Sequence, residues 1–446
     1  MNKNFSVLIK SKIKKFNKII KVPSDKSCSI RALIFASICI GKSEIKNLLE
    51  SEDVLNCLKI LKHKFNVKII KKKNVYLVYG NGLNSFRLKK LTKIFVGNSA
   101  TTARLIMGAV STYPSKFYFY GGRSMNKRNL SQIISIFEKI GCFFYPKNKS
   151  TLPLLMEGTS MPLAQKHENR GSAQIKSAIL LSALSTPGIT TIEEKETSRN
   201  HTENLLKKIS ADIKIKKIGK KNLITLDGQK NLHGFNYTVS ADPSSAAFLI
   251  VLTLLTPGAK LTIHNVLCND TRIFFIKILK KSNANIKIKN LKTVSGELVG
   301  SIEVSSSNKL KPIIISKDVG KFIDELPILF TLAAKIPGIS KFRNVGALKN
   351  KESDRLLESK KLLVQAGVKC ITTKDSMIIY GKEKIESQNK SILIKTKGDH
   401  RICMSSVIFS LATGISTKIK NFETVNTSFP GFVSVIKNLG GKIVIK

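Results

Sequence analysis

The sequence is poor in negative charge. Asp and Glu number 29, against 76 Lys and Arg, so the formal net charge is +47 over 446 residues. There is no tryptophan, and aromatic residues make up only 7% of the chain. Apolar residues still reach 42%, a value typical of globular proteins, which excludes a disordered basic tail. The length exceeds what one hydrophobic core usually organises, so we expect at least two domains.

Long apolar runs are also lacking. The longest, Ala246–Leu255, is about half of the roughly 18 to 20 residues that a membrane-spanning helix needs. The apolar stretch Phe5–Ile9, near the Lys-rich N-terminus, is too short to form the core of a signal peptide. We therefore expect a cytoplasmic protein with no membrane partner.

Cysteines are present, but not in a pattern that indicates a disulfide framework or a zinc module. They stand at positions 28, 39, 57, 142, 268, 370 and 403, an odd number with no C-x-x-C pair. We expect reduced, buried thiols, no metal site and no cofactor.

The high positive charge raises the alternative of a basic nucleic-acid-binding protein. The lysines, however, are spread along the whole chain, and in 212–216 and 285–289 they alternate with Ile. This period of two places Ile on the core face of a strand and Lys in water. No RNA- or DNA-reading motif is present, so we expect no specific nucleic-acid partner and attribute the lysines to compositional drift.

The strongest signal in the sequence is an internal repeat. An apolar, helix-like run ends at a Gly or Pro and is followed by a strand-like segment, six times, at spacings of 70 to 80 residues. The breaks are at Gly41, Pro114, Pro187-Gly188, Pro257-Gly258, Pro337-Gly338 and Gly414. A second, amphipathic helix is predicted to begin near Glu52, Leu130, Asn200, Asp270, Lys351 and Phe432. We expect a mixed α/β fold of six units in two groups of three, with the first helix of each unit buried and the second on the surface.

The residues at the start of each buried helix point to the ligand. A helix N-terminus carries unpaired N–H groups and a partial positive charge, so Ser, Asp or Asn there can be ordinary caps. Caps do not explain Lys26, Arg31 and Arg401, because a cation is unfavourable at that position unless an anion lies beside it. The pattern therefore indicates one or two small substrates that carry several phosphates or carboxylates.

Seven motifs, in order along the chain, resemble those of one family. They are Pro23-Ser-Asp-Lys-Ser-Cys-Ser-Ile-Arg31, Gly97-Asn-Ser-Ala-Thr101, Ser172-Ala-Gln-Ile-Lys-Ser177, Asp242-Pro-Ser-Ser245, Lys351-Glu-Ser-Asp-Arg355, Asp399-His-Arg401 and Thr427-Ser-Phe-Pro430. Together they resemble the 3-phosphoshikimate 1-carboxyvinyltransferases, the enolpyruvyl transferases of the shikimate pathway and aromatic amino-acid biosynthesis. Three segments are similar to those of the glyphosate-tolerant bacterial subgroup of this family: the Asp-Lys-Ser start of the first motif, Leu48-Leu-Glu-Ser-Glu-Asp53, and the Ser-Ala-Gln motif.

The resemblance implies a fold and a reaction. The fold is an α/β (α+β) two-domain inside-out barrel of the enolpyruvyl transferase type, with six βαβαββ units, three per domain. One domain spans 22–240, the discontinuous second spans 1–21 plus 241–446, and the active site lies in the cleft between them. The implied reaction moves the enolpyruvyl group of phosphoenolpyruvate to the 5-hydroxyl of shikimate 3-phosphate and releases phosphate. A monomer without a cofactor is expected.

The resemblance also implies roles for individual residues. The residues expected to bind shikimate 3-phosphate are Lys26, Ser27, Arg31, Ser172, Gln174, Arg199, Asp324 and Lys351. Those expected to bind phosphoenolpyruvate are Lys26, Ala100, Arg128, Gln174, Arg355 and Arg401. The catalytic residues would be Asp324 as the base near the 5-hydroxyl, and Glu352 with Lys26 as the acid that protonates the methylene carbon.

The nearest alternative is the sister enolpyruvyl transferase that acts on UDP-N-acetylglucosamine. That enzyme uses a Cys in the loop after a Gly-Gly pair, whereas here Gly121-Gly122 is followed by Arg123-Ser124-Met125. The Asp-His-Arg and Lys-Glu-Ser-Asp-Arg motifs also favour the shikimate enzyme.

Overall fold

The computed structural model describes residues 5–387 and 390–446, and the chain divides into two compact units. Unit 1 comprises the chain up to Pro23, Ala241–Lys292 and Leu298–Lys446, and unit 2 comprises Ser24–Ser240 and Thr293–Glu297. Within the described residues, no helix combines the length and the apolar character that crossing a bilayer requires.

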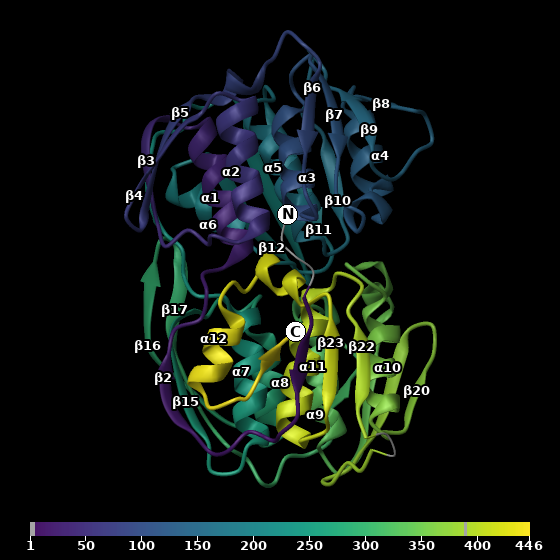
Figure 1. Cartoon of the computed structure of the whole chain (residues 1–446). Helices are drawn as coiled ribbons and strands as arrows, with labels where there is room; N and C mark the ends of the chain where they lie inside the picture. Colours follow the sequence, from purple (N-terminus) through teal and green to yellow (C-terminus); the bar gives the residue numbers. More distant parts are fainter. Residues whose placement is uncertain (1–4, 388–389) are drawn as a thin grey trace. The chain divides into compact units, whose positions relative to one another are not determined.

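Each unit is built around three buried helices, as the apolar runs predicted (Figure 1). In unit 2 these are α1 (Lys26–Ile38), α3 (Ala100–Val110) and α5 (Ala173–Leu184); in unit 1 they are α7 (Pro243–Leu255), α9 (Leu326–Ala334) and α11 (His400–Thr413). In each unit the three helices pack together, α3 touching α1 and α5, and α11 touching α7 and α9. Because nearly every side of these helices is apolar, none of them can face water without loss of hydrophobic free energy.

Six four-stranded sheets cover these helices. The unit 2 sheets, in strand order, are β14 (Asn236–Thr238), β3 (Ile40–Lys46), β5 (Val75–Asn81) and β4 (Lys68–Lys72); β6 (Thr92–Phe95), β7 (Lys116–Tyr120), β9 (Leu154–Glu157) and β8 (Phe143–Tyr145); and β10 (Lys166–Asn169), β11 (Ile189–Glu194), β13 (Lys221–Asp227) and β12 (Ile213–Ile218). Those of unit 1 are β16 (Asn285–Val294), β17 (Glu297–Ser305), β15 (Lys260–Leu267) and β2 (Asn17–Ile20); β18 (Ile314–Ile315), β19 (Gly338–Arg343), β21 (Ser376–Gly381) and β20 (Cys370–Thr372); and β22 (Ile392–Lys395), β23 (Thr417–Lys420), β1 (Val7–Ile9) and β24 (Val444–Ile445).

One topology recurs in these sheets. The strand before a buried helix pairs in parallel with the strand after it, as β10 does with β11, and two further antiparallel strands complete the sheet. This is a βαβαββ unit, so the predicted mixed α/β fold of six units, three in each group, is confirmed.

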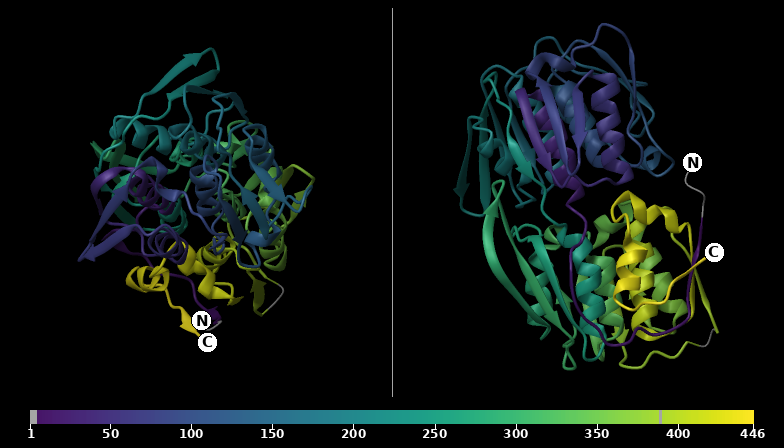
Figure 2. Two further views of the ribbon diagram at one scale, coloured as in Figure 1. Left: turned by 90° about the horizontal axis from the view of Figure 1, so that it is seen from above. Right: turned by 60° about the vertical axis from the view of Figure 1, so that its left-hand side comes forward.

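Three strands reach their sheets from distant parts of the sequence. β14 pairs in parallel with β3, and β2 pairs in parallel with β15, so the first sheet of each group contains a strand from elsewhere in the chain. β1 lies between β23 and β24, which places both ends of the described chain in one unit 1 sheet (Figure 2). These three sheets therefore depend on pairing between segments far apart in the sequence as well as on local hairpins.

The amphipathic helices are α2 (Glu52–Lys64), α4 (Ser131–Lys139), α6 (His201–Lys208), α8 (Phe274–Lys281), α10 (Arg355–Gln365) and α12 (Phe432–Asn438), and short 3₁₀ helices span Leu83–Phe86, Met125–Lys127, Val319–Lys321, Gly346–Asn350 and Phe422–Thr427. Two predicted starts were wrong by four residues, because α8 begins after Asp270 and α10 begins after Lys351. The cause is local capping. The side chain of Asp354 accepts a hydrogen bond from Leu357 N at 3.0 Å and fixes the start of α10, while that of Asn269 accepts from Thr271 N at 2.9 Å and makes a turn before α8.

The predicted burial of Ile in the Lys–Ile alternation is correct only in part. Ile213 of β12 and Ile286 of β16 are buried, but Ile215 is 37% exposed. β12 is an edge strand, so the core covers only part of its inner face.

The cysteines agree more closely with the prediction of buried thiols: Cys370 is half-buried and the other six are buried.

Four glycines hold the last strands of a unit against its buried helix. Gly80, Gly158, Gly228 and Gly381 each lie at or just after the end of a strand, against the carbonyl groups at the C-terminal end of a buried helix. A Cβ atom at Gly228 would lie 1.8 Å from the carbonyl oxygen of Thr186 and 2.4 Å from that of Ala183. Only a residue without a Cβ allows the strand to approach this closely.

We expect Gly228→Ala to destabilise unit 2 by at least about 1 to 3 kcal/mol, because the added methyl group meets backbone atoms that cannot rotate away. Gly320→Ala is the matched control, since a Cβ there meets nothing within 4 Å. Its effect should stay within about 0.5 kcal/mol. Thermal unfolding of the two variants checks this prediction, and equal midpoints would contradict it.

Candidate active site

In unit 2 the N-terminal ends of the three buried helices lie at the same end of the bundle. Arg31, near the start of α1, donates from Nη2 to Ser177 Oγ of α5 at 2.7 Å. Gln174, at the start of α5, donates from Nε2 to Thr101 Oγ1 of α3 at 3.0 Å. Three partial positive charges are therefore concentrated at one end of the unit, which is the arrangement that binds anions.

The first two turns of α1 carry three of the predicted binding residues. Lys26 Nζ lies 2.7 Å from Asp53 Oδ2, and the side chain of Lys26 is 22% exposed. Arg31 is 2% exposed and donates from Nε to Thr202 Oγ1 at 2.9 Å, and its Nη1 contacts Ser27 Oγ. Burial lowers the pKa of Arg31, and the nearby charge of Arg199 acts in the same direction. Arg31 thus orders Ser27, while Lys26 remains accessible.

A second group of cations lies beside Gln174. The side chain of Arg104, on α3, contacts Gln174 Oε1 and donates from Nη2 to the carbonyl of Asn129 at 3.4 Å. Burial and, to a lesser extent, the charge of Arg128 together lower the pKa of Arg104 to about 10. Among the described residues, no hydrogen-bond partner is found for the buried Arg104 Nε. Sequence reasoning missed Arg104, although it lies four residues after Ala100 on the same helix.

The remaining predicted residues of unit 2 lie at element ends. Ser172 is the N-cap of α5, and its Oγ accepts from Ile175 N at 3.4 Å. Ala100 is the first residue of α3 and is 3% exposed. Arg199 lies just before α6, and Arg128 follows the 3₁₀ helix Met125–Lys127.

In unit 1 the helix starts also meet. Ser244, in the first turn of α7, donates from its hydroxyl to Glu325 at the start of α9. Arg401, in the first turn of α11, donates from Nη1 to the carbonyl of Asp324 at 2.9 Å, and the same atom lies 3.7 Å from Glu325 Oε1. The predicted residues Asp324 and Arg401 are therefore neighbours.

Arg355 is the centre of the unit 1 cluster. It is 1% exposed; its Nε donates to Asp399 Oδ2 at 2.8 Å, its Nη1 to Asp324 Oδ1 at 3.1 Å, and its Nη2 contacts Glu352. Burial disfavours the charge on Arg355, but the three carboxylates outweigh burial and raise its pKa. Lys351 Nζ lies 3.3 Å from Asp324 Oδ1. The structure thus brings Asp324, Lys351, Glu352, Arg355 and Arg401 together.

The fold and these clusters define a class of protein. An EPSP synthase structure from Acinetobacter baumannii superposes with a TM-score of 0.84 at 32% identity, over 99% of this chain and 100% of that one. The enolpyruvyl transferase NikO from Streptomyces tendae shares the fold alone, with a TM-score of 0.77 at 12% identity over 99% of each chain. The fold is that of the enolpyruvyl transferases.

Sequence comparison identifies the family. The family model described as EPSP synthase (3-phosphoshikimate 1-carboxyvinyltransferase) matches residues 10–436. The chain is 37% identical to the 3-phosphoshikimate 1-carboxyvinyltransferase of Bartonella quintana, over 95% of this chain and 96% of the relative. It is 34% identical to that of Paramagnetospirillum magneticum, over 95% and 94%. The chain belongs to the EPSP synthase family, and the predicted fold, enzyme class and function are confirmed.

We expect Asp399→Asn to destabilise unit 1 by about 3 to 5 kcal/mol, because it removes one partner of a buried ion pair with Arg355. Asp399 is 0% exposed, and it also caps α11 by accepting from Arg401 N at 2.9 Å. The matched control is Asp318→Asn, which removes the exposed pair with Lys321 and should cost less than about 1 kcal/mol. Thermal unfolding gives the stability of both variants. An Asp399→Asn protein as stable as the control would contradict the prediction and show that Asp324 and Glu352 alone compensate the charge of Arg355.

Proposed function

We propose that the chain binds shikimate 3-phosphate and phosphoenolpyruvate, and that the two clusters described above serve this one pair of substrates. The unit 2 cluster would supply Lys26, Ser27, Arg31, Ser172, Gln174 and Arg199 to shikimate 3-phosphate, and Lys26, Ala100, Arg128 and Gln174 to phosphoenolpyruvate. The unit 1 cluster would add Asp324 and Lys351 for the former, and Arg355 and Arg401 for the latter. The observation that carries the proposal is the meeting of helix N-termini with Lys and Arg side chains in each unit.

The charge distribution supports a division of roles. Asp324 lies 3.1 Å from Arg355 and 3.3 Å from Lys351, and two nearby cations favour the ionised carboxylate that a base requires. Asp324 would take the proton of the 5-hydroxyl as its oxygen attacks phosphoenolpyruvate. Lys26 and Glu352 would deliver a proton to the methylene carbon. Loss of phosphate, with loss of a proton from the new methyl group, would then restore the double bond.

Four further assignments complete the proposal: the domain limits, the oligomeric state, the absence of a nucleic-acid partner and the localisation. We take domain limits at 22–240 and at 1–21 plus 241–446, each with three repeat units. Because one chain supplies both clusters, a monomer suffices for activity. No specific nucleic-acid partner is required, since the scattered lysines have an ordinary role on strand surfaces, and a biosynthetic role of this kind places the chain in the cytoplasm.

Phosphate release tests the function directly. The purified protein should release phosphate only when both substrates are present. Lys26→Ala should lower kcat by at least about a hundredfold, because it removes a charge placed to stabilise the reacting centre. Lys93→Ala, at an exposed position of β6, is the control and should leave kcat unchanged. Near-normal kcat in Lys26→Ala would remove Lys26 from the mechanism, and phosphate release without shikimate 3-phosphate would overturn the function.

We further propose that the chain belongs to the glyphosate-tolerant subgroup because of Ala100. In sensitive members a Gly stands at the matching position, and the added methyl group would crowd glyphosate, which is longer than phosphoenolpyruvate. Crowding by one methyl group costs about 1 to 3 kcal/mol, or roughly tenfold to a hundredfold in affinity.

Ala100→Gly should therefore lower the ratio of the glyphosate inhibition constant to KM for phosphoenolpyruvate by about tenfold or more. Ala103→Gly makes the same exchange at a fully buried position of α3 and should leave the ratio unchanged. Steady-state inhibition kinetics on the wild type and both variants give the ratio. An unchanged ratio in Ala100→Gly, or strong inhibition of the wild type, would refute this role of Ala100.

A further inference from the structure

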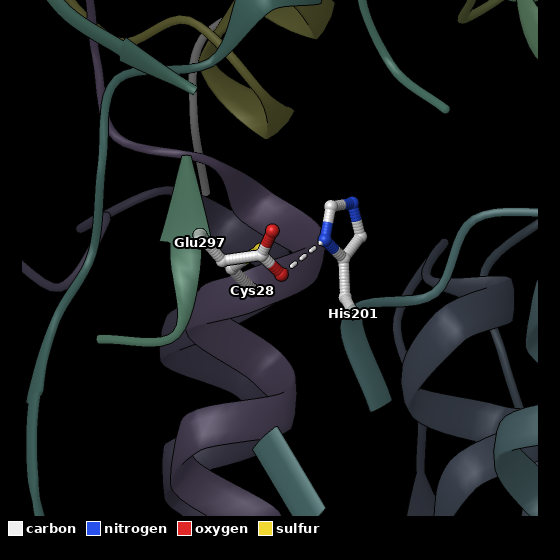
Figure 3. Close-up of side chains that lie close together, drawn as sticks. All are labelled: Cys28, His201 and Glu297. Atoms are coloured by element: carbon white, nitrogen blue, oxygen red, sulfur yellow. Dashed lines mark hydrogen bonds and ion pairs between the residues drawn. The ribbon is translucent and has the colours of Figure 1, made fainter. Parts of the chain in front are cut away.

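Three side chains that bind metals well lie together in unit 2, outside the proposed substrate-binding set (Figure 3). They are Cys28 in the first turn of α1, His201 at the start of α6 and Glu297 at the start of β17. One ligand atom from each lies within 4.8 Å of the other two, and His201 Nδ1 is 2.8 Å from Glu297 Oε1. Within the described part of the chain, this is the one group of three or more His, Cys, Asp or Glu with such spacing.

All three side chains are buried, with exposures of 3% for Cys28, 1% for His201 and 3% for Glu297. His201 and Glu297 form a hydrogen-bonded pair, and the thiol of Cys28 lies beside that pair. Buried charges are usually compensated by a partner ion or by a metal. Tyr237 hydrogen-bonds with Cys28 and also lies within electrostatic reach of Glu297, and Cys28 interacts electrostatically with Arg31.

We propose that Cys28, His201 and Glu297 bind a divalent transition-metal ion of the zinc type, which joins the first turn of α1, the start of α6 and the tip of the β16–β17 hairpin. A thiolate, an imidazole nitrogen and a carboxylate oxygen are three of the ligand types that Zn²⁺ prefers. The two negative charges of the thiolate and the carboxylate balance the charge of the ion. Tetrahedral coordination at about 2.0 to 2.3 Å places ligand atoms roughly 3.3 to 3.6 Å apart. The His201 and Glu297 atoms, which lie 2.8 Å apart, must therefore separate by about 0.5 Å, and the other pairs, which lie within 4.8 Å, must approach by at most about 1.5 Å.

Binding has a defined proton balance. The thiol of Cys28 loses its proton to the solvent as sulfur becomes a metal ligand. The proposal takes His201 as neutral before binding, with its proton on Nδ1 toward Glu297. This proton moves to Nε2, so that Nδ1 can coordinate the ion. One proton is therefore released for each ion bound. Sequence spacing could not reveal the site, because its three ligands come from distant parts of the chain.

Cobalt is the probe for this site, since Co²⁺ replaces Zn²⁺ and a cobalt–thiolate bond gives a charge-transfer absorption band. After treatment with a chelator, the wild-type protein should bind one Co²⁺ with this band, and Zn²⁺ should displace it. Cys28→Ser should lack the band. Cys57→Ser, which changes another buried cysteine of unit 2, should retain it. A band that persists in Cys28→Ser, or no band in the wild type, would overturn the proposal.

Two further measurements guard against misfolding of the Cys28→Ser variant. Glu297→Gln should keep the cobalt–thiolate band but bind Co²⁺ at least tenfold more weakly. Calorimetry of the wild type in buffers of different ionisation enthalpy should show one proton released per Co²⁺. Equal affinity in Glu297→Gln, or binding without proton release, would refute the ligand set. None of these measurements depends on the enzymatic reaction, so they test the site separately from the proposed function.

Discussion

The structure depends on bringing the positive ends of buried helices together within each unit. Such an arrangement is unfavourable without compensating negative charge, and the two units supply that charge differently. In unit 1 the chain itself provides it: Asp399, Asp324 and Glu352 surround Arg355, which is 1% exposed. In unit 2 burial, together with the nearby charge of Arg128, lowers the pKa of Arg104 to about 10. Carboxylates therefore surround the buried arginine of unit 1, whereas cations lie next to one another in unit 2.

The position of these charges depends in turn on close backbone packing. A Cβ at Gly108 of α3 would lie 2.4 Å from the carbonyl oxygen of Ala178 of α5, so these two helices meet at backbone contact. That approach lets Gln174 reach both Thr101 and Arg104. The glycines at the strand ends have the same effect at the opposite ends of the helices. A side chain of fixed length can bridge two helices only when the distance between their axes is fixed. The close packing of α3 and α5 therefore determines the geometry of the contacts that Gln174 makes.

Much of this architecture could be predicted from the sequence, because each repeat combines an apolar helix, a break and an amphipathic helix that local residues determine. The motif residues could also be placed at helix starts, where caps and charges leave a local signal. The contributions of Arg104 and Asp53 could not be predicted in the same way, since Arg104 is a mid-helix residue and Asp53 acts through its contact with Lys26, far along the chain. The predicted starts of α8 and α10 were wrong because a local hydrogen bond outweighs hydrophobic periodicity at a helix end. Asn269 accepts that bond before α8, and Asp354 accepts it at the start of α10.

The β16–β17 hairpin shows how a few polar contacts can decide which unit a segment belongs to. Its strands pair within a unit 1 sheet, yet Thr293–Glu297 at its tip belongs to unit 2. The tip is held there by Ser295 Oγ, which accepts from Thr238 N at 2.8 Å, and by the bond between His201 and Glu297. The bond between His201 and Glu297 is buried, and a buried hydrogen bond is stronger, and its loss more costly, than one at the surface. Of the residues in these two contacts, His201 and Glu297 are also proposed to bind the metal ion, so the site would lie where the hairpin tip meets unit 2.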